Sequence, residues 1–392
     1  MKRLSLAPIA LALGLSFSAQ AEPTITICEW GTITGADALV NGMAYGARDY
    51  FEYLNQTKGG IAGVKINALL LDGRYKLDEE LKIYRRCVSQ ENAVVIGGWS
   101  TGAAKALRAD TTKDQVPFMT QSYSSDLLNP EKFPCMFMAG PTYEQQIILG
   151  LNDAKKRGAR RVVLMHADNE YGRAPVKVIR EEKAVEKLGM ELVDVIEFKY
   201  DAQDLTAQLI RVKESKPDVV YIQSSTNQTI VILRDAAKIG LKPDLFVGNF
   251  YNINPAIPEQ LKESAEGFRT VQLYTNWGVD IPAMRQINEF SKKNKIEKQD
   301  IYYMKGWLEG MVIAAAIENA VKANGGKVPE DISAFRKATR DQLAALKNFD
   351  TGGISPKLNY ADHRGFSQAR MAIIKGGKYI GATDWLKLAD DQ

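Results

Sequence analysis

Short apolar runs alternate with longer amphipathic stretches along most of this chain, and the series occurs twice. The runs have the length and composition of buried strands, and the stretches between them have the period of helices. Strands that alternate with helices of about 10–15 residues predict a parallel sheet covered by helices on both faces. We therefore predict an α/β protein with two doubly wound parallel-sheet lobes.

The first series starts at Thr24 and the second follows Pro141. The expected strands cover residues 24–31, 65–72, 93–96, 116–119 and 135–140, then 161–166, 191–198, 218–223, 245–248 and 268–274. The expected helices cover residues 43–55, 78–90, 102–111, 144–156, 174–188, 204–214, 229–239, 281–293, 300–322 and 330–346. Asp78 is the expected N-cap of its helix. A β-hairpin over residues 371–380 turns on Gly376-Gly377.

The length of 392 residues suits two domains, and no low-complexity linker divides the chain. We expect a three-segment hinge, with crossings between the lobes near Gly140, Thr270 and Ser355. The predicted segments are a leader over 1–21, lobe 1 over 22–141 and 271–355, and lobe 2 over 142–270 and 356–392.

The first residues have the pattern of an export signal. Lys2 and Arg3 precede an almost entirely apolar stretch, and Ser18-Ala19-Gln20-Ala21 supplies a small-x-small cleavage site. The apolar stretch is shorter than the roughly 20 residues of a membrane span. Cys28 lies too far beyond Ala21 for a lipoprotein anchor. We predict cleavage after Ala21, a periplasmic location and no membrane insertion.

The charge balance argues against a dedicated polyanion partner. The chain has 51 Lys and Arg against 47 Asp and Glu, so removing Lys2 and Arg3 leaves a net charge near +2. No nucleic acid is therefore expected as a partner. The most basic run, residues 155–161, contains Gly158, and cations followed by glycine are typical of a helix C-terminus.

The three cysteines allow one disulfide in an oxidising compartment. Cys87, on a predicted helix, and Cys135, before a predicted strand, are the expected pair, although the sequence leaves the other connectivities open. Cys28 falls within a buried strand and is expected to act as a small hydrophobe. The cysteine spacing fits no metal cluster, and no cofactor is expected.

Small hydroxylated residues follow two neighbouring strands. The strand over 93–96 leads into Gly97-Gly98-Trp99-Ser100-Thr101, and the strand over 116–119 leads into Thr120-Gln121-Ser122-Tyr123-Ser124. In open α/β sheets, ligands bind beyond the carboxyl ends of the strands. Hydroxyls and free backbone N–H groups there suit a small anionic or amide-bearing ligand. Ser100 is also a plausible N-cap, and both roles can coexist, because a helix N-terminus also binds anions.

Enzymatic motifs are missing from the sequence. It has no G-x-S-x-G elbow, no P-loop lysine motif and no H-E-x-x-H. The two histidines are His166 and His363, and a structural role for His166 is favoured over a catalytic one. The sequence therefore predicts a receptor and not an enzyme.

Several short motifs, taken in their order and spacing, resemble one known family. They are Gly59-Gly60-Ile61, Val95-Ile96-Gly97 leading to Ser100, Asn169-Glu170-Tyr171-Gly172, and Ile232-Leu233-Arg234 with Gly240-Leu241. The chain resembles type I periplasmic solute-binding proteins of ABC importers, in the leucine/isoleucine/valine-binding family, over nearly its whole length. The resemblance implies a hinge receptor, expected to be a monomer, that delivers a small molecule to a membrane permease and ATPase.

The resemblance also implies roles for particular residues. Ser100, with Ser122 and Ser124, would hold the ligand carboxylate, and Tyr171 would cover the ligand from lobe 2. The family's acidic partner of an α-ammonium aligns with Phe250 here, and Ser225 replaces a second aromatic residue.

With no acid expected nearby, a buried ammonium would lack a partner, which argues against an ordinary α-amino acid. Aromatic side chains at predicted strand ends could sandwich a flat ligand. They are Trp30, Trp99, Tyr123, Tyr171, Phe250 and Tyr251. The hypothesis is a small carboxylate, amide or amino-acid-like ligand, plausibly aromatic, bound by hinge closure. The alternatives are a ligand sensor of the same fold and, more remotely, an exported α/β hydrolase.

Overall fold

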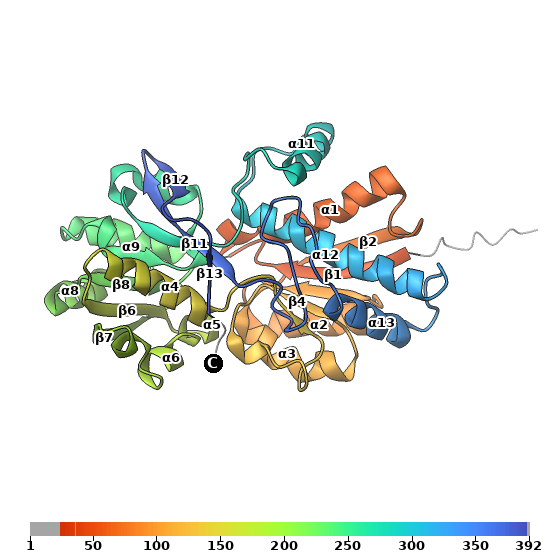
Figure 1. The fold of residues 1–392 in the computed structure, drawn as a ribbon, viewed down its shortest axis with the longest axis horizontal. Helices are drawn as coiled ribbons and strands as arrows, with labels where there is room; N and C mark the ends of the chain where they lie inside the picture. The colour runs from red at the N-terminus through yellow and green to blue at the C-terminus, as the bar shows by residue number, and fades with distance from the viewer. Residues whose placement is uncertain (1–23, 36, 390–392) are drawn as a thin grey trace, which may run out of the picture.

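The computed structural model describes residues 24–35 and 37–389, and the predicted leader with its cleavage site at Ala21 lies outside them. Two sheets form the cores of two lobes that lie side by side (Figure 1). The expected α/β class with two doubly wound lobes is confirmed. Among the described residues, no helix combines the length and the apolar character needed to cross a bilayer.

The sheet of lobe 1 has five strands in the order β2-β1-β3-β4-β5, all paired in parallel. Its strands are β1 (Thr24–Gly31), β2 (Lys65–Asp72), β3 (Val95–Gly98), β4 (Phe118–Thr120) and β5 (Met136–Phe137). Its helices are α1 (Gly42–Lys58), α2 (Leu77–Ser89), α3 (Thr101–Lys113), α11 (Pro282–Asn294), α12 (Ile301–Ala323) and α13 (Ile332–Ala344). Gly46 and Gly306 let α1 and α12 cross closely, because a Cβ on either glycine would clash with backbone of the other helix.

The sheet of lobe 2 has the order β12-β11-β10-β9-β8-β6-β7, with β13 paired to β11. Its strands are β6 (Arg161–Ala167), β7 (Glu191–Phe198), β8 (Val219–Gln223), β9 (Phe246–Gly248), β10 (Arg269–Gln272), β11 (Gln368–Lys375), β12 (Lys378–Gly381) and β13 (Leu386–Lys387). Its helices are α4 (Tyr143–Lys156), α5 (Glu170–Arg173), α6 (Val176–Arg180), α7 (Ala184–Lys187), α8 (Thr206–Ser215), α9 (Thr226–Lys238) and α10 (Ala256–Leu261). Strands β11 and β12 are antiparallel and form the expected hairpin at Gly376-Gly377.

Short 3₁₀ helices occupy several connections. They are η1 (Ala38–Val40), η2 (Ser125–Leu127), η3 (Pro243–Leu245), η4 (Phe250–Asn252) and η5 (Lys262–Ala265). Between Ser355 and β11, the carbonyls of His363 and Arg364 accept hydrogen bonds from the amides of Met138 and Gly140, at 3.0 and 2.9 Å. The residue limits of the lobes at 141, 270 and 355 stay a prediction.

The disulfide prediction is wrong. The bridge joins Cys28 and Cys87, with their Cα atoms 5.9 Å apart, and Cys135 is a buried free thiol. Cys28 does lie in a buried strand, as expected. However, α2 packs over that strand and turns Cys87 toward it, a contact that the sequence does not reveal.

Two local predictions also fail, and one holds. The helix expected over 174–188 is divided into α6 and α7, because Lys183 adopts a left-handed backbone with φ +52°. Asp78 is not an N-cap: it lies in the first turn of α2, where its charge still favours the helix dipole. The basic run from 155 is a helix end, since α4 stops at Lys156 and Gly158 has φ +100°.

Candidate ligand-binding cleft

Lobe 1 presents the residues that follow β3. Ser100 has φ +83° and caps α3, with its Oγ accepting a hydrogen bond from the Ala103 amide at 3.1 Å. The same hydroxyl donates to Glu80 Oε2 at 2.5 Å. Burial raises the pKa of Glu80 to about 8, so this carboxyl is mostly protonated at neutral pH. A neutral Glu80 leaves the helix N-terminus at Ser100 compatible with an anionic ligand.

The residues after β4 complete the wall of lobe 1. The hydroxyls of Thr101 and Ser122 lie 2.8 Å apart, and Ser122 Oγ accepts from the Ser124 amide at 3.2 Å. The hydroxyl of Ser124 is buried and has no hydrogen-bond partner within residues 24–35 and 37–389. The two strand ends therefore place the predicted hydroxyls side by side.

Lobe 2 presents aromatic side chains opposite them. The Tyr171 hydroxyl donates to the Ser224 carbonyl at 2.7 Å and to Asn249 Oδ1 at 3.0 Å as alternative acceptors. Tyr251 packs edge-on against Trp99 with ring centroids 4.9 Å apart, and its hydroxyl donates to the Gln121 carbonyl of lobe 1. These contacts join the two walls.

A small cavity of about 10 Å³ lies between the walls. It is lined by Tyr75, Trp99, Ser100, Thr101, Gln121, Ser122, Tyr143, Tyr171 and Tyr251. This volume suits about one water molecule, so a larger ligand requires the walls to separate or a side chain to move. The cavity brings together six of the eleven residues predicted from sequence.

The other five predicted residues do not line it. Trp30 donates from Nε1 to the Trp99 carbonyl at 3.1 Å and so supports the loop after β3. Tyr123 pairs its hydroxyl with Tyr274 at 2.8 Å, and Phe250 is completely buried among aromatic rings. Ser124 contacts Ser122 through its backbone amide, and its side chain does not line the cavity. The Ser225 hydroxyl instead donates a hydrogen bond to Asp37 Oδ1.

Asp37 corrects the expectation that no acid lies near the site. This residue precedes η1 in lobe 1, is fully buried, and accepts a hydrogen bond through Oδ1 from the Ser225 hydroxyl of lobe 2. Among the described residues, none makes a hydrogen bond of good geometry to its Oδ2, although Tyr200 and Trp99 lie near the carboxyl. Burial raises the pKa of Asp37 to about 6, against the hydrogen bonds of Ser225, Tyr200 and Trp99, which lower it. This acid comes from lobe 1, whereas the family resemblance had aligned it with Phe250 in lobe 2.

A second group of ionisable side chains lies behind the cleft wall. Lys305 and Glu309 form a fully buried ion pair on α12, and Gln121 donates to Glu309 Oε2 at 2.7 Å. The Lys305 ammonium also donates to Gln121 Oε1. Burial and then the neighbouring Glu309 raise the pKa of Glu29 well above its usual value. Gln121 thus connects the cavity to this buried charge cluster.

Sequence reasoning missed Tyr75, Gln121 and Tyr143 as lining residues. Tyr75 follows β2 and Gln121 follows β4, so the strand-end rule that found Ser100 could also have found them. Tyr143 opens α4 behind a Thr142 capping box, which marks a helix start but gives no sign of a cleft.

Both histidines have structural partners. His166 Nδ1 lies 3.0 Å from the Ala167 carbonyl, and His363 Nδ1 lies 2.9 Å from the Met136 carbonyl. Burial lowers the pKa of each imidazole. Neither side chain lines the cleft cavity.

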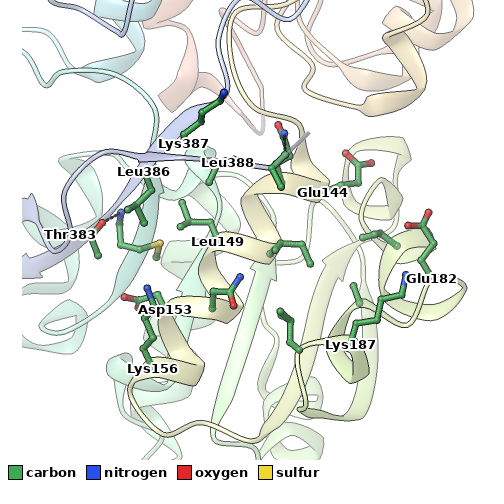
Figure 2. Close-up of a pocket in the computed structure, with 18 of the residues that line it drawn as sticks. Glu144, Leu149, Asp153, Lys156, Glu182, Lys187, Thr383, Leu386, Lys387 and Leu388 are labelled. Carbon is green, nitrogen blue, oxygen red and sulfur yellow. Dashed lines mark hydrogen bonds between the residues drawn. The ribbon is translucent and has the colours of Figure 1, made fainter. Parts of the chain in front are cut away.

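A larger hollow of about 720 Å³ lies away from the cleft, between α4 and the C-terminal segment (Figure 2). Leu149, Leu386 and Leu388 form part of its apolar lining, with Lys156 and Lys187 at its edge (Figure 2). Apart from Ser125, its lining comes from lobe 2. Movement between the lobes would therefore not enclose a ligand there, and we place the candidate site in the cleft.

Two α/β lobes with a polar and aromatic cleft between them define a binding protein of the hinged, two-lobed class. Residues 24–378 match the family model described as "Periplasmic binding protein", and the chain belongs to this family. It is a binding protein and not an enzyme, as expected from the sequence, and its family is periplasmic.

Relatives support this assignment. The Leu/Ile/Val-binding protein homolog 7 of Brucella abortus (strain 2308) is 23% identical over 292 residues, which cover 71% of this chain and 72% of the relative.

The fold is also similar to solved structures. A branched chain amino acid ABC transporter protein from Thermus thermophilus with bound valine has a TM-score of 0.83 and 22% identity, with 93% of this chain and 97% of that one covered. A fatty acid ABC transporter substrate-binding protein from Thermomonospora curvata has a TM-score of 0.80 and 19% identity, covering 93% and 92%. The differing ligands in these names leave the ligand to be inferred from the site.

Proposed function

We propose that this protein is the extracytoplasmic receptor of an ABC importer and captures a small carboxylate, amide or amino-acid-like ligand, plausibly aromatic, by hinge closure. The observation that carries the proposal is the cavity lined from both lobes, with hydroxyls on one wall and tyrosines on the other. A ligand that contacts both walls binds the closed form more tightly than the open form, and this difference drives closure.

The two ends of the cleft suit different ligand groups. Ser122, Thr101 and the N-terminus of α3 offer hydroxyls and backbone N–H groups to a carboxylate or amide oxygen. Asp37 does not line the cavity, and its buried carboxylate becomes an acceptor for a ligand N–H group only when the lobes separate. The acid at Asp37 supports adding ordinary α-amino acids, which the sequence disfavoured, to the candidate ligands, while the carboxylate or amide end of the ligand stays at the hydroxyls.

Ligand screening tests the proposal. Thermal shift over amino acids, amides and aromatic acids should reveal a stabilising ligand, since a ligand at 100 times its Kd adds about 2.7 kcal/mol. Ser122→Ala should weaken binding of that ligand by about 1–3 kcal/mol in calorimetry. Ser291→Ala, which removes another buried serine hydroxyl but lies on α11, is the matched control and should leave affinity unchanged. Equal affinities for both variants and wild type would remove the cleft assignment.

The importer role has its own tests. Deletion of the gene should abolish uptake of the ligand found in the screen, and normal uptake with altered ligand-dependent gene expression would favour a sensor. The mass of the secreted protein should correspond to a start at Glu22, and light scattering should give the mass of a monomer. No turnover of bound ligand after long incubation would exclude the hydrolase alternative.

A further inference from the structure

Tyr75 reaches the cleft from a loop with an unusual backbone. This residue follows β2, and both Arg74 and Tyr75 adopt positive φ values, +52° and +56°. Residues other than glycine rarely adopt this region, and such conformations persist where surrounding contacts hold them. Asp72 Oδ1 accepts from the Arg74 amide at 3.1 Å and fixes the start of the loop. The loop therefore directs the Tyr75 ring toward lobe 2.

The outer face of the Tyr75 ring is stacked on Tyr200 of lobe 2. Their ring centroids are 4.8 Å apart and their planes differ by 17°, and Asn169 Nδ2 donates to the Tyr75 hydroxyl at 3.4 Å. Tyr200 is itself held within lobe 2, since its carbonyl accepts from Gln228 Nε2 at 2.7 Å. Its hydroxyl donates to Ser225 Oγ at 3.3 Å, beside the bond from Ser225 to Asp37.

Tyr75 also borders the cavity. Tyr75 lines it together with the hydroxyls of lobe 1, whereas Tyr200 does not. Trp99, another lining residue, lies 6.2 Å from Tyr75 between ring centroids. Tyr75 thus borders the cavity and is backed by the Tyr200 ring.

We propose that Tyr75, supported by Tyr200, is a specificity-determining residue whose ring covers the bound ligand and selects a planar aromatic ring over a saturated ring of the same size. This inference rests on the proposed function and narrows its ligand class. A planar ring can lie against Tyr75 while the stack on Tyr200 re-forms behind it. A saturated ring is thicker and lacks the charge distribution that favours aromatic pairs.

Four probes separate this inference from the proposed function. They are benzamide, benzoate, cyclohexanecarboxamide and cyclohexanecarboxylate. Comparing the amides with the carboxylates tests recognition by the hydroxyls of lobe 1. Comparing the aromatic with the saturated rings tests the role of Tyr75. The two amides form one pair of probes and the two acids form the other. In calorimetry, the wild-type protein should bind the aromatic probe about three- to tenfold more tightly than the saturated probe, in whichever pair shows binding. This is the factor expected when two aromatic rings pack together.

Variants assign the preference to this ring. Tyr75→Ala should remove the preference for the aromatic member, Tyr75→Phe should retain it, and Tyr200→Ala should reduce it. Tyr45→Ala, which removes a half-buried tyrosine on α1 outside the cavity, should leave it unchanged.

Each other outcome has a defined meaning. Binding of saturated and aromatic probes with equal affinity, or a preference that survives Tyr75→Ala, would overturn the role of Tyr75 and leave the proposed function standing. Failure of all four probes to bind in the millimolar range would overturn both the ligand class and this inference.

Discussion

The two walls of the cleft are built differently. On the lobe 1 wall, Ser100 donates to Glu80 and the hydroxyls of Thr101 and Ser122 bond to each other, all within lobe 1. The same two hydroxyls also interact with Tyr143 of lobe 2. In lobe 2, Tyr251 on the cavity wall and Ser225, which does not line the cavity, each donate to lobe 1. Hydrogen bonds within lobe 1 thus hold Ser100 in place, whereas Ser225 and Tyr251 of lobe 2 bond to the opposite lobe.

The interiors of the two lobes also differ, in how deeply their ion pairs are buried and in the presence of a disulfide. Lobe 1 contains the Cys28–Cys87 bridge and the fully buried Lys305–Glu309 pair. The most buried ion pair of lobe 2, between Arg269 and Asp153, keeps 12% and 9% of its side chains exposed. We infer that lobe 1 is the more rigid half of the site. The predictions below test it, from the largest effect to the smallest.

Lys305→Met should have the largest effect on stability. It leaves Glu309 buried without its cation, and breaking a buried pair costs about 3–5 kcal/mol. Burial already raises the pKa of Glu309 and lowers that of Lys305, so neither charge is favoured alone. Guanidinium unfolding measures the loss. Lys322→Met, which breaks an exposed pair with Glu318, should cost less than about 1 kcal/mol. Similar losses for the two variants would contradict a stabilising buried cluster.

Replacing Cys28 and Cys87 together by serine should destabilise the protein by about 2–4 kcal/mol, because the bridge closes a loop with a sequence separation of 59. Unfolding by urea measures this loss. Cys135→Ala keeps the bridge and serves as the control for loss of a buried sulfur. Thiol titration of the denatured, oxidised wild type should detect one thiol, and three thiols would refute the bridge.

The pH dependence of closure should reflect Asp37. Its pKa is raised to about 6 in the contacted form, and an opened cleft would return it toward 3.8. The contacted form therefore binds the extra proton, and its stability relative to the open form should fall by about 1–2 kcal/mol as pH rises from about 4 to 6. Small-angle scattering should show expansion over this range. In Asp37→Asn, the stability of the contacted form should no longer fall between pH 4 and 6. An unchanged pH dependence in this variant would assign the effect to another group, such as Asp300.

Ser100→Ala should have the smallest effect on folding, about 1 kcal/mol, through loss of the α3 cap. Differential scanning calorimetry measures it. Ser122→Ala removes no helix cap and is the comparison for the lobe 1 wall. A loss well above 2 kcal/mol for Ser100→Ala would mean that its bond to Glu80 matters more than the cap.

Local patterns predicted much of the fold. The bounds of β2 and β7 match the sequence prediction, because each strand is rich in aliphatic residues and starts two residues after a glycine, Gly63 or Gly189. The same patterns located Ser100 and Ser122, since both follow buried strands that are neighbours in the sheet. The helix before β7 was predicted too long, because its amphipathic pattern continues through Lys183, whose left-handed backbone has no marker in the sequence.

The sequence by itself determined the α/β class, the two lobes and the hydroxyl wall, because apolar periodicity and strand ends are encoded by residues close together in the chain. The tertiary structure decided which cysteines pair, that Asp37 supplies the acid, and that Tyr75 meets Tyr200. Those partners lie 59, 188 and 125 positions apart and are brought together only when helices pack on sheets and one lobe contacts the other.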